Sequence, residues 1–171
     1  MVEIEVKLPV ADLKAFHESL LRHGARLDKE RHAEENTLYD FRSGELRSKG
    51  QALRLRDAGR KSFLTFKGTP QKSRRFKVRD EFETEVQNGK QIRRILKSLG
   101  LIPTFRYSKH RTVYRKGSVK ICLDETIAGN FAELEGERSD IVKLAKTLGY
   151  SPAQMIKRGY VEMIRDAGKA V

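Results

Sequence analysis

Two pairs of glutamates stand two residues apart in the sequence, Glu3 with Glu5 and Glu133 with Glu135. Alternate residues of a β-strand share a face, so each pair places two carboxylates side by side if its segment is a strand. A solvated face gains nothing from such clustering, because like charges repel. A divalent cation turns the repulsion into binding, since Mg²⁺ takes carboxylate oxygens and waters. The pairs therefore predict a metal site. Because Glu133→Gln would relieve the repulsion between the carboxylates, we also predict that this variant is as stable as the wild type, or slightly more stable, without metal.

Basic residues alternate with apolar residues in neighbouring segments. Residues 51–57 place Leu53 and Leu55 on one face of a predicted strand and Arg54 and Arg56 on the other. We expect the two guanidinium groups to hold the anion that the metal also touches. The same alternation puts further side chains on the polar faces of residues 61–67, 76–86 and 118–124, namely Thr65, Lys67, Lys77, Arg79, Glu81, Glu83, Glu85, Lys120, Cys122 and Asp124.

Any one of these strands is also typical of an antiparallel sheet with one face in water. As a set they favour another arrangement, because nearly every polar face carries charges rather than Ser, Thr or Gln. A closed barrel turns such a face inward and removes the sheet edges. The apolar face must then be covered from outside by amphipathic helices. We therefore predict an α+β fold in which helices pack outside a closed antiparallel barrel, in a single domain of residues 1–171.

Hydrophobic periodicity predicts the elements that position these residues. Asp12 and Gly24 are suitable start and stop residues for one helix, and Ser151-Pro152 fits the N-cap and first position of the final helix. Residues 68–75 are predicted to form a mobile basic loop. Strands are expected at residues 2–8, 37–41, 51–57, 61–67, 76–86, 104–115, 118–124 and 130–135, and helices at residues 13–23, 90–99, 140–148 and from 152 onward.

Composition limits the partners. The chain of 171 residues has a formal net charge of +13, which implies an anionic partner such as nucleic acid or a phosphorylated small molecule. Aromatic residues are only 8% and Trp is absent, so nucleic acid is disfavoured. Cys122 is the single cysteine, which excludes an intrachain disulfide and fits a cytoplasmic protein. No stretch approaches the roughly 20 apolar residues of a membrane span, and no signal peptide is expected.

Seven short motifs, in order along nearly the whole chain, resemble the CYTH superfamily, also called triphosphate tunnel metalloenzymes. The first is the N-terminal strand Glu3-Ile4-Glu5-Val6-Lys7. Each motif is unspecific by itself, and the ordered set carries the resemblance. The others are Ala52-Leu53-Arg54-Leu55-Arg56, Leu64-Thr65-Phe66-Lys67-Gly68, Arg79-x-Glu81-x-Glu83, Lys109-x-Arg111, Leu123-Asp124-Glu125 and Phe131-Ala132-Glu133-Leu134-Glu135-Gly136.

The resemblance implies an eight-stranded antiparallel tunnel that binds a triphosphate together with Mg²⁺ or Mn²⁺. Catalysis would consist mostly of positioning and charge neutralisation. The implied metal ligands are Glu3, Glu5, Glu81, Glu83, Asp124, Glu133 and Glu135. The implied triphosphate-binding residues are Lys7, Arg54, Arg56, Lys67, Arg79, Lys109 and Arg111, and the implied catalytic residues are Lys7, Lys109, Arg111 and Asp124.

The superfamily includes class IV adenylyl cyclases and thiamine, inorganic and RNA triphosphatases. Val6-Lys7-Leu8 after the second glutamate is similar to the cyclase branch, because the inorganic triphosphatases tend to have Arg-Lys-Phe there. The predicted reaction is conversion of ATP to cyclic AMP and pyrophosphate. Two alternatives stay open: hydrolysis of inorganic, thiamine or nucleoside triphosphate, and non-catalytic binding of nucleic acid or polyphosphate. The sequence predicts a monomer or a homodimer without choosing between them.

Overall fold

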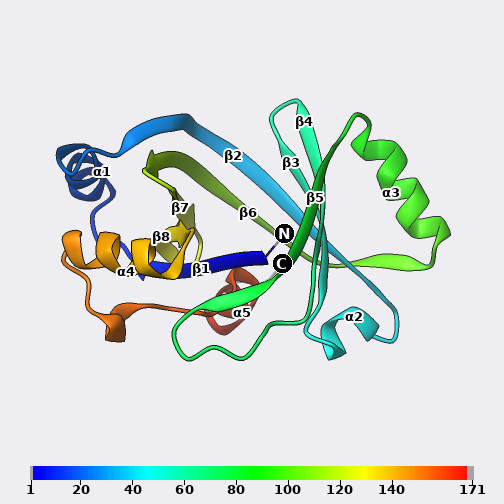
Figure 1. Cartoon of the computed structure of the whole chain (residues 1–171). Helices are drawn as coiled ribbons and strands as arrows, with labels where there is room; N and C mark the ends of the chain where they lie inside the picture. The colour runs from blue at the N-terminus through cyan, green and yellow to red at the C-terminus, as the bar shows by residue number, and fades with distance from the viewer. Residues whose placement is uncertain (1, 169–171) are drawn as a thin grey trace.

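The computed structural model describes residues 2–168, and its strands form a closed barrel. The strands are joined in the order β1-β5-β4-β3-β2-β6-β7-β8, and every neighbouring pair is antiparallel. The predicted barrel of eight antiparallel strands is thus confirmed (Figure 1). The strands are β1 (Val2–Pro9), β2 (Arg26–Phe41), β3 (Ala52–Ala58), β4 (Lys61–Lys67), β5 (Lys77–Val86), β6 (Leu101–Lys116), β7 (Val119–Thr126) and β8 (Gly129–Glu135).

Five α-helices surround the barrel: α1 (Leu13–Arg22), α2 (Glu45–Ser48), α3 (Gly89–Ser98), α4 (Arg138–Thr147) and α5 (Tyr160–Asp166). Asp12 caps α1 by accepting a hydrogen bond from the amide of Ala15, as the sequence predicts. In Figure 1, α1 and α4 lie on one side of the barrel and α3 lies on the other. Among the described residues, no helix has the length and apolar character needed to cross a membrane.

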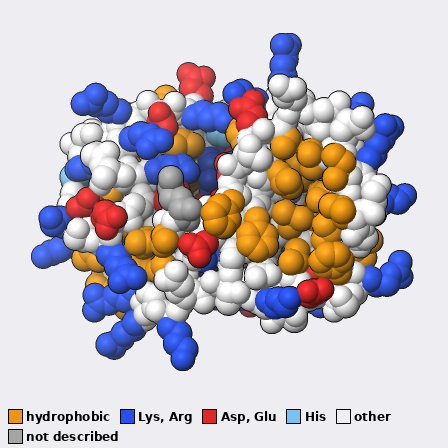
Figure 2. All heavy atoms as spheres, turned by 45° about the vertical axis from the view of Figure 1, so that its right-hand side comes forward, with side chains coloured by type: hydrophobic (Ala, Val, Ile, Leu, Met, Phe, Trp, Pro, Cys, Tyr) orange, Lys and Arg blue, Asp and Glu red, His pale blue; other side chains and the backbone are white. Residues whose placement is uncertain are grey.

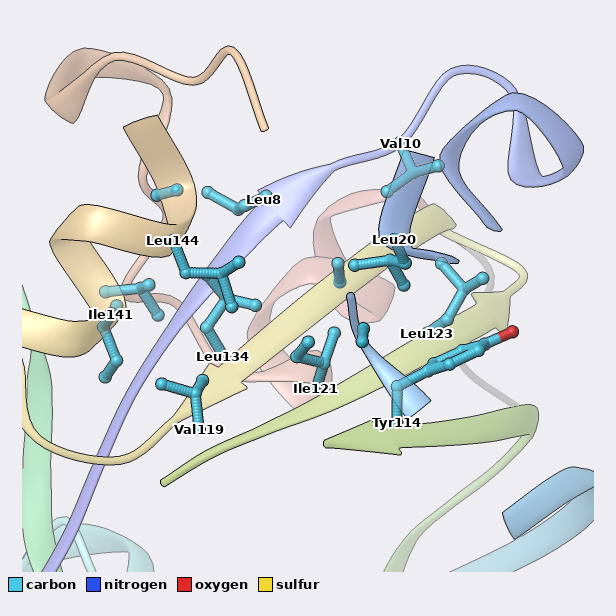
Figure 3. Close-up of a cluster of buried hydrophobic side chains, with 14 of the residues drawn as sticks. Leu8, Val10, Leu20, Tyr114, Val119, Ile121, Leu123, Leu134, Ile141 and Leu144 are labelled. Carbon is cyan, nitrogen blue, oxygen red and sulfur yellow. The ribbon is translucent and has the colours of Figure 1, made fainter. Parts of the chain in front are cut away.

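The largest apolar core lies outside the barrel wall, beneath α1 and α4. Outward-facing side chains of β1, β7 and β8, such as Leu8, Ile121 and Leu134, meet Leu20 of α1 and Ile141 of α4 (Figure 3). All five are fully buried. Burial of a side chain of this size contributes about 2 kcal/mol, so this core holds the apolar strand faces outward and leaves the interior to the charged faces.

The opposite side of the barrel is covered more thinly. Leu96 of α3 is buried against Leu55 of β3, whereas Leu99, at the C-terminal end of α3, is 64% exposed. Phe82 on the outside of β5 is 61% exposed. Figure 2 shows hydrophobic side chains gathered on the side of the molecule that carries α3.

Three elements differ from the sequence-based prediction, and one of them is α2, which lies at Glu45–Ser48, where no helix was predicted. β2 begins at Arg26 rather than at residue 37, because pairing with β6 along its length holds the segment extended without apolar alternation. The final helix does not begin at Pro152. Ser151 and Gln154 form a capping box around a single 3₁₀ turn, after which Ile156 pairs with Lys7 of β1. Because that pairing requires extended backbone, the helix is delayed to Tyr160.

Candidate functional site

A cavity of about 760 Å³ occupies the barrel interior, within the range typical of small-molecule sites. All of the predicted site residues except Asp124 line it. Among the described residues, its lining holds eleven lysine or arginine side chains and eight carboxylates, an excess of positive charge that suits an anionic ligand. The predicted residues that line it are Glu3, Glu5, Lys7, Arg54, Arg56, Lys67, Arg79, Glu81, Glu83, Lys109, Arg111, Glu133 and Glu135.

β1 contributes three alternating charged side chains to the cavity. Glu3 accepts hydrogen bonds from the ammonium group of Lys67 at 2.9 and 3.0 Å. Glu5 lies 2.8 Å from the ammonium group of Lys77. Lys7 lies 2.9 Å from a carboxylate oxygen of Glu133 on the neighbouring strand β8. The strand alternation that predicted these residues therefore joins them to charged residues of β4, β5 and β8.

The most buried part of the site is organised around Asp124 of β7, whose side chain is fully buried. Its Oδ1 accepts a hydrogen bond from Arg111 Nε at 2.6 Å. Its Oδ2 accepts from Arg111 Nη2 at 2.5 Å, from Lys109 Nζ at 3.0 Å and from the Tyr160 hydroxyl at 2.6 Å. Arg111 also pairs with Glu133. Asp124 is therefore surrounded by donors, an arrangement that orients Lys109 and Arg111.

The arginines of β3 extend the site toward β4 and β5. Arg54 donates hydrogen bonds to Thr65 at 3.2 Å and to Glu83 at 3.3 Å. Arg56 donates to Glu83 at 2.9 Å and to Glu34 at 3.4 Å. Arg56 is thus held between Glu83 of β5 and Glu34 of β2, and Arg54 contacts β4 and β5.

Three of the cavity arginines have an unused donor. The Nε atoms of Arg54, Arg56 and Arg79 are buried and have no hydrogen-bond partner, although the Nε of Arg79 lies 3.8 Å from a carboxylate oxygen of Glu3. A buried charged donor without a partner is costly, and a ligand with several anionic oxygens would satisfy it. Guanidinium groups also match phosphate oxygens in geometry.

Two glutamates of the site differ in protonation. Burial, a hydrogen bond with Glu81 and the charge of Glu5 raise the pKa of Glu3 to about 7. Burial acts in the same sense on Glu81, but that hydrogen bond, Lys67 and Arg54 outweigh it and lower the pKa of Glu81 to about 2. The pKa values of Glu3 and Glu81 are therefore shifted in opposite directions, as expected of two interacting carboxyl groups in one site.

Glu133 is held in its charged form. Burial by itself would raise its pKa, but Lys7, Arg111 and Lys109 outweigh burial and hold the pKa well below its ordinary range. Likewise, burial would lower the pKa of Lys7, and Glu133 and Glu5 together raise it. Attraction to three cations opposes the sequence-based expectation that Glu133→Gln leaves the metal-free protein as stable or more stable, and we instead expect a loss of stability.

The fit of a divalent cation depends on the oxygen donors. Across residues 2–168, no three Asp, Glu, His or Cys side chains converge into a preformed metal site. The donor type still fits Mg²⁺ or Mn²⁺, since the cavity lining formed by the described residues contains carboxylates and neither His nor Cys. The carboxyl groups of Glu3 and Glu81 interact with each other, and a cation between them would replace that interaction with coordination to both.

Several residues of the site were not assigned a role from the sequence. Lys77 and Lys120 line the cavity from positions that the strand alternation had put on polar faces. Glu34 is buried and lies 3.6 Å from Lys109, but it falls in the part of β2 that lacks apolar alternation. Tyr160 belongs to α5, and no local pattern places that helix against the barrel interior.

Comparisons with known proteins agree with this architecture. A protein named "Putative adenylate cyclase MJ0240" from Methanocaldococcus jannaschii is 29% identical to this chain, over 95% of this chain and 98% of its own. A solved structure from Vibrio parahaemolyticus, described as a putative adenylate cyclase, has a TM-score of 0.86 at 23% identity and covers 96% of this chain and 98% of its own.

A third relative is HpAC1 from Hippeastrum, a putative adenylyl cyclase described as having a dominant triphosphatase activity. Its structure has a TM-score of 0.68 at 22% identity, over 99% of this chain and 97% of its own. At these identities the two solved structures support the fold alone. Residues 1–160 match the family model of the CYTH domain, which is most of the chain. This chain is a member of the CYTH domain family.

Proposed function

We propose that this protein is a divalent-metal-dependent enzyme that binds a triphosphate in the barrel and converts ATP to cyclic AMP and pyrophosphate. The observation that carries the proposal is the set of buried guanidinium Nε atoms without hydrogen-bond partners, those of Arg54, Arg56 and Arg79, in a cavity with excess positive charge. The names of the Methanocaldococcus and Vibrio relatives support the cyclase assignment.

The proposed role of the cavity cations is to bind and orient the phosphate chain. In cyclisation, the ribose 3′-hydroxyl attacks the α-phosphorus and the pyrophosphate leaves. The chain would contribute position and charge neutralisation to this step, because little covalent chemistry is asked of the protein in phosphoryl transfer. The residues proposed to bind the phosphates are Lys7, Arg54, Arg56, Lys67, Arg79, Lys109 and Arg111.

Asp124 is proposed to act through Lys109 and Arg111 rather than by binding metal itself. Four hydrogen bonds from three side chains already reach its carboxylate, and it does not line the cavity. The glutamates that line the cavity remain the proposed metal ligands: Glu3, Glu5, Glu81, Glu83, Glu133 and Glu135. A bound Mg²⁺ or Mn²⁺ would supply neutralisation of the phosphate charge.

Hydrolysis of a triphosphate is the second candidate, because the Hippeastrum relative is described as a dominant triphosphatase. In hydrolysis, water would attack the terminal phosphorus, and the same cations would serve. Product analysis with ATP, inorganic triphosphate and thiamine triphosphate, each with Mg²⁺ or Mn²⁺, separates the two reactions. Cyclic AMP with pyrophosphate supports cyclisation, orthophosphate supports hydrolysis, and the absence of any product from all three substrates would refute both.

Replacing Arg54 or Arg56 by alanine is expected to weaken triphosphate binding by roughly 1.5–3 kcal/mol, because a charge-assisted hydrogen bond is lost in each case. The fold should persist, with a lower melting temperature, since Glu83 loses a partner. Calorimetric titration with the triphosphate and a thermal melt measure both effects.

Lys61→Ala is the matched control for these variants. Lys61 also pairs with a glutamate of β5, Glu85 at 2.9 Å, but both side chains are at least half exposed. Such a surface pair contributes at most about 1 kcal/mol to stability, and its loss should leave triphosphate affinity unchanged. Equal affinity in the wild type, Arg54→Ala and Arg56→Ala would contradict binding in the barrel.

A further inference from the structure

The segment after α4 completes the wall of the barrel beside Lys7. β5 pairs with β1 only along Val2–Glu5, so the edge of β1 at Lys7 has no partner from β5. Ile156 takes that place through two backbone hydrogen bonds, from the Lys7 amide at 2.9 Å and to the Lys7 carbonyl at 2.8 Å. This pairing brings Tyr160, four residues later, to the cavity.

Tyr160 contacts three charged residues of the candidate site. Its ring centroid lies 4.8 Å from the ammonium nitrogen of Lys7 and 4.7 Å from that of Lys109. Its hydroxyl donates a hydrogen bond to Asp124 at 2.6 Å. The ring is packed edge-on against Phe131, and the residue is only 6% exposed. Tyr160 is therefore fixed between β1, β6 and β7 and touches each of them through a charged side chain.

The physical effect of this arrangement falls on the two lysines. An aromatic face attracts an ammonium group, most strongly where water is excluded. One ring that contacts two ammonium groups therefore offsets part of their mutual repulsion and fixes their direction without neutralising them. Glutamates also contact the two lysines, but a carboxylate cancels positive charge that an anionic ligand could use. An aromatic ring leaves the full charge available to that ligand.

We propose that Tyr160 is a positioning residue, which holds the ammonium groups of Lys7 and Lys109 in the direction of the bound triphosphate. This inference rests on the proposed function, since it assigns Lys7 and Lys109 to phosphate binding. The inference adds the segment after α4 to the candidate site. Tyr160 belongs to this segment and is the last residue of the matched CYTH domain.

Two substitutions separate the ring from the hydroxyl. Tyr160→Leu removes both, and we expect the affinity for ATP and for inorganic triphosphate to fall at least tenfold. Tyr160→Phe keeps the ring, and we expect affinity within about threefold of the wild type. Calorimetric titration in Mg²⁺ buffer measures both values, and thermal melts record the loss of stability.

Tyr150→Leu is the matched control. Tyr150 also packs edge-on against a phenylalanine, Phe16, and also donates a hydrogen bond, to the Pro9 carbonyl at 2.7 Å, but it lies outside the barrel. We expect Tyr150→Leu to lower the melting temperature and to leave affinity unchanged. A fall in affinity that Tyr150→Leu shares with Tyr160→Leu would overturn the positioning role and attribute the loss to stability.

A spectroscopic measurement tests the geometry without substrate. The ammonium nitrogens of Lys7 and Lys109 lie over the ring, so the adjacent Hε protons should have upfield NMR shifts in the wild type and Tyr160→Phe. These shifts should disappear in Tyr160→Leu and persist in Tyr150→Leu. Unshifted lysine protons in the wild type would overturn the inference. If the shifts are present but the wild type binds no triphosphate, the proposed function fails, and Tyr160 then has no phosphate-binding lysine to position. If the wild type and Tyr160→Leu bind the triphosphate equally, only the positioning role of Tyr160 fails.

Discussion

Replacing Glu133 by glutamine is expected to lower turnover of the triphosphate substrate at least tenfold at saturating substrate and ordinary Mg²⁺, about 1.4 kcal/mol in the barrier. Glu133 contacts Lys7 and Arg111 and faces the cavity. The substitution removes a proposed metal ligand and releases both cations from a fixed orientation. Turnover assays at several Mg²⁺ concentrations measure the effect, and lower metal affinity should appear as a higher Mg²⁺ requirement.

The same variant is expected to lose stability in metal-free buffer. Lys7, Arg111 and Lys109 hold the pKa of Glu133 well below its ordinary range, which means that its charged form stabilises the folded protein. Removing one partner of a buried ion pair costs about 3 kcal/mol, because the remaining charges stay buried without compensation. A thermal or denaturant melt without metal measures this loss. Unchanged metal-free stability would show that the ion pairs at Glu133 contribute nothing to folding.

Glu137→Gln provides the comparison for both measurements. Glu137 is exposed and stands two residues beyond β8, at the start of α4, where its side chain makes no capping hydrogen bond. Its replacement should change stability by no more than about 0.5 kcal/mol and leave turnover unaffected. If the two variants behave alike in both assays, the charged interior has no part in the reaction.

Removal of divalent metal by EDTA is expected to abolish turnover, and addition of Mg²⁺ or Mn²⁺ is expected to restore it. The reason is the set of glutamates in a cavity that otherwise suits an anion: Glu3, Glu5, Glu81, Glu133 and Glu135 all line it. Without a cation, these carboxylates would repel a triphosphate that the arginines attract. Turnover after dialysis against EDTA, with and without metal added back, tests this dependence.

Metal chelation also needs a control for stability. A melt of the EDTA-treated protein should show a folded chain, because Glu3, Glu5, Glu81, Glu133 and Glu135 are each paired with a lysine or arginine side chain. Loss of turnover in a folded protein then reflects the reaction rather than unfolding. Full turnover in metal-free buffer would exclude the metal-dependent mechanism.

Most of the barrel could be predicted from the sequence, because strands with one apolar and one charged face carry a period of two residues. Residues 51–57 and 61–67 show it plainly, and both lie within one residue of the observed β3 and β4. The first part of β2 does not show it, since residues 26–31 are exposed on both faces. The pairing that makes this segment a strand comes from β6, in which Arg115 lies opposite Arg26 and Arg111 opposite His32.

The candidate site, like the fold, could be predicted from the sequence in part. Alternation along single strands predicted which charged residues share a face, and that prediction is confirmed for Arg54 and Arg56 and for Glu3, Glu5 and Lys7, all of which line the cavity. Their roles in binding metal and phosphate stay predictions. The pairing of each carboxylate could not be predicted, because it depends on the register between strands, which sets Lys7 opposite Glu133 and Arg111 opposite Asp124.

The sequence by itself determined the class of fold, the charged interior and many of the charged residues that line it, because strand periodicity is a local property of the chain. Only the tertiary structure decided that attraction outweighs repulsion at Glu133, that Asp124 lies behind the cavity wall, and that Tyr160 reaches Lys7 and Lys109. These outcomes depend on distances between residues remote in sequence. Coulomb and cation–π energies vary with such distances and with burial, and neither quantity is encoded in the spacing of residues along one strand.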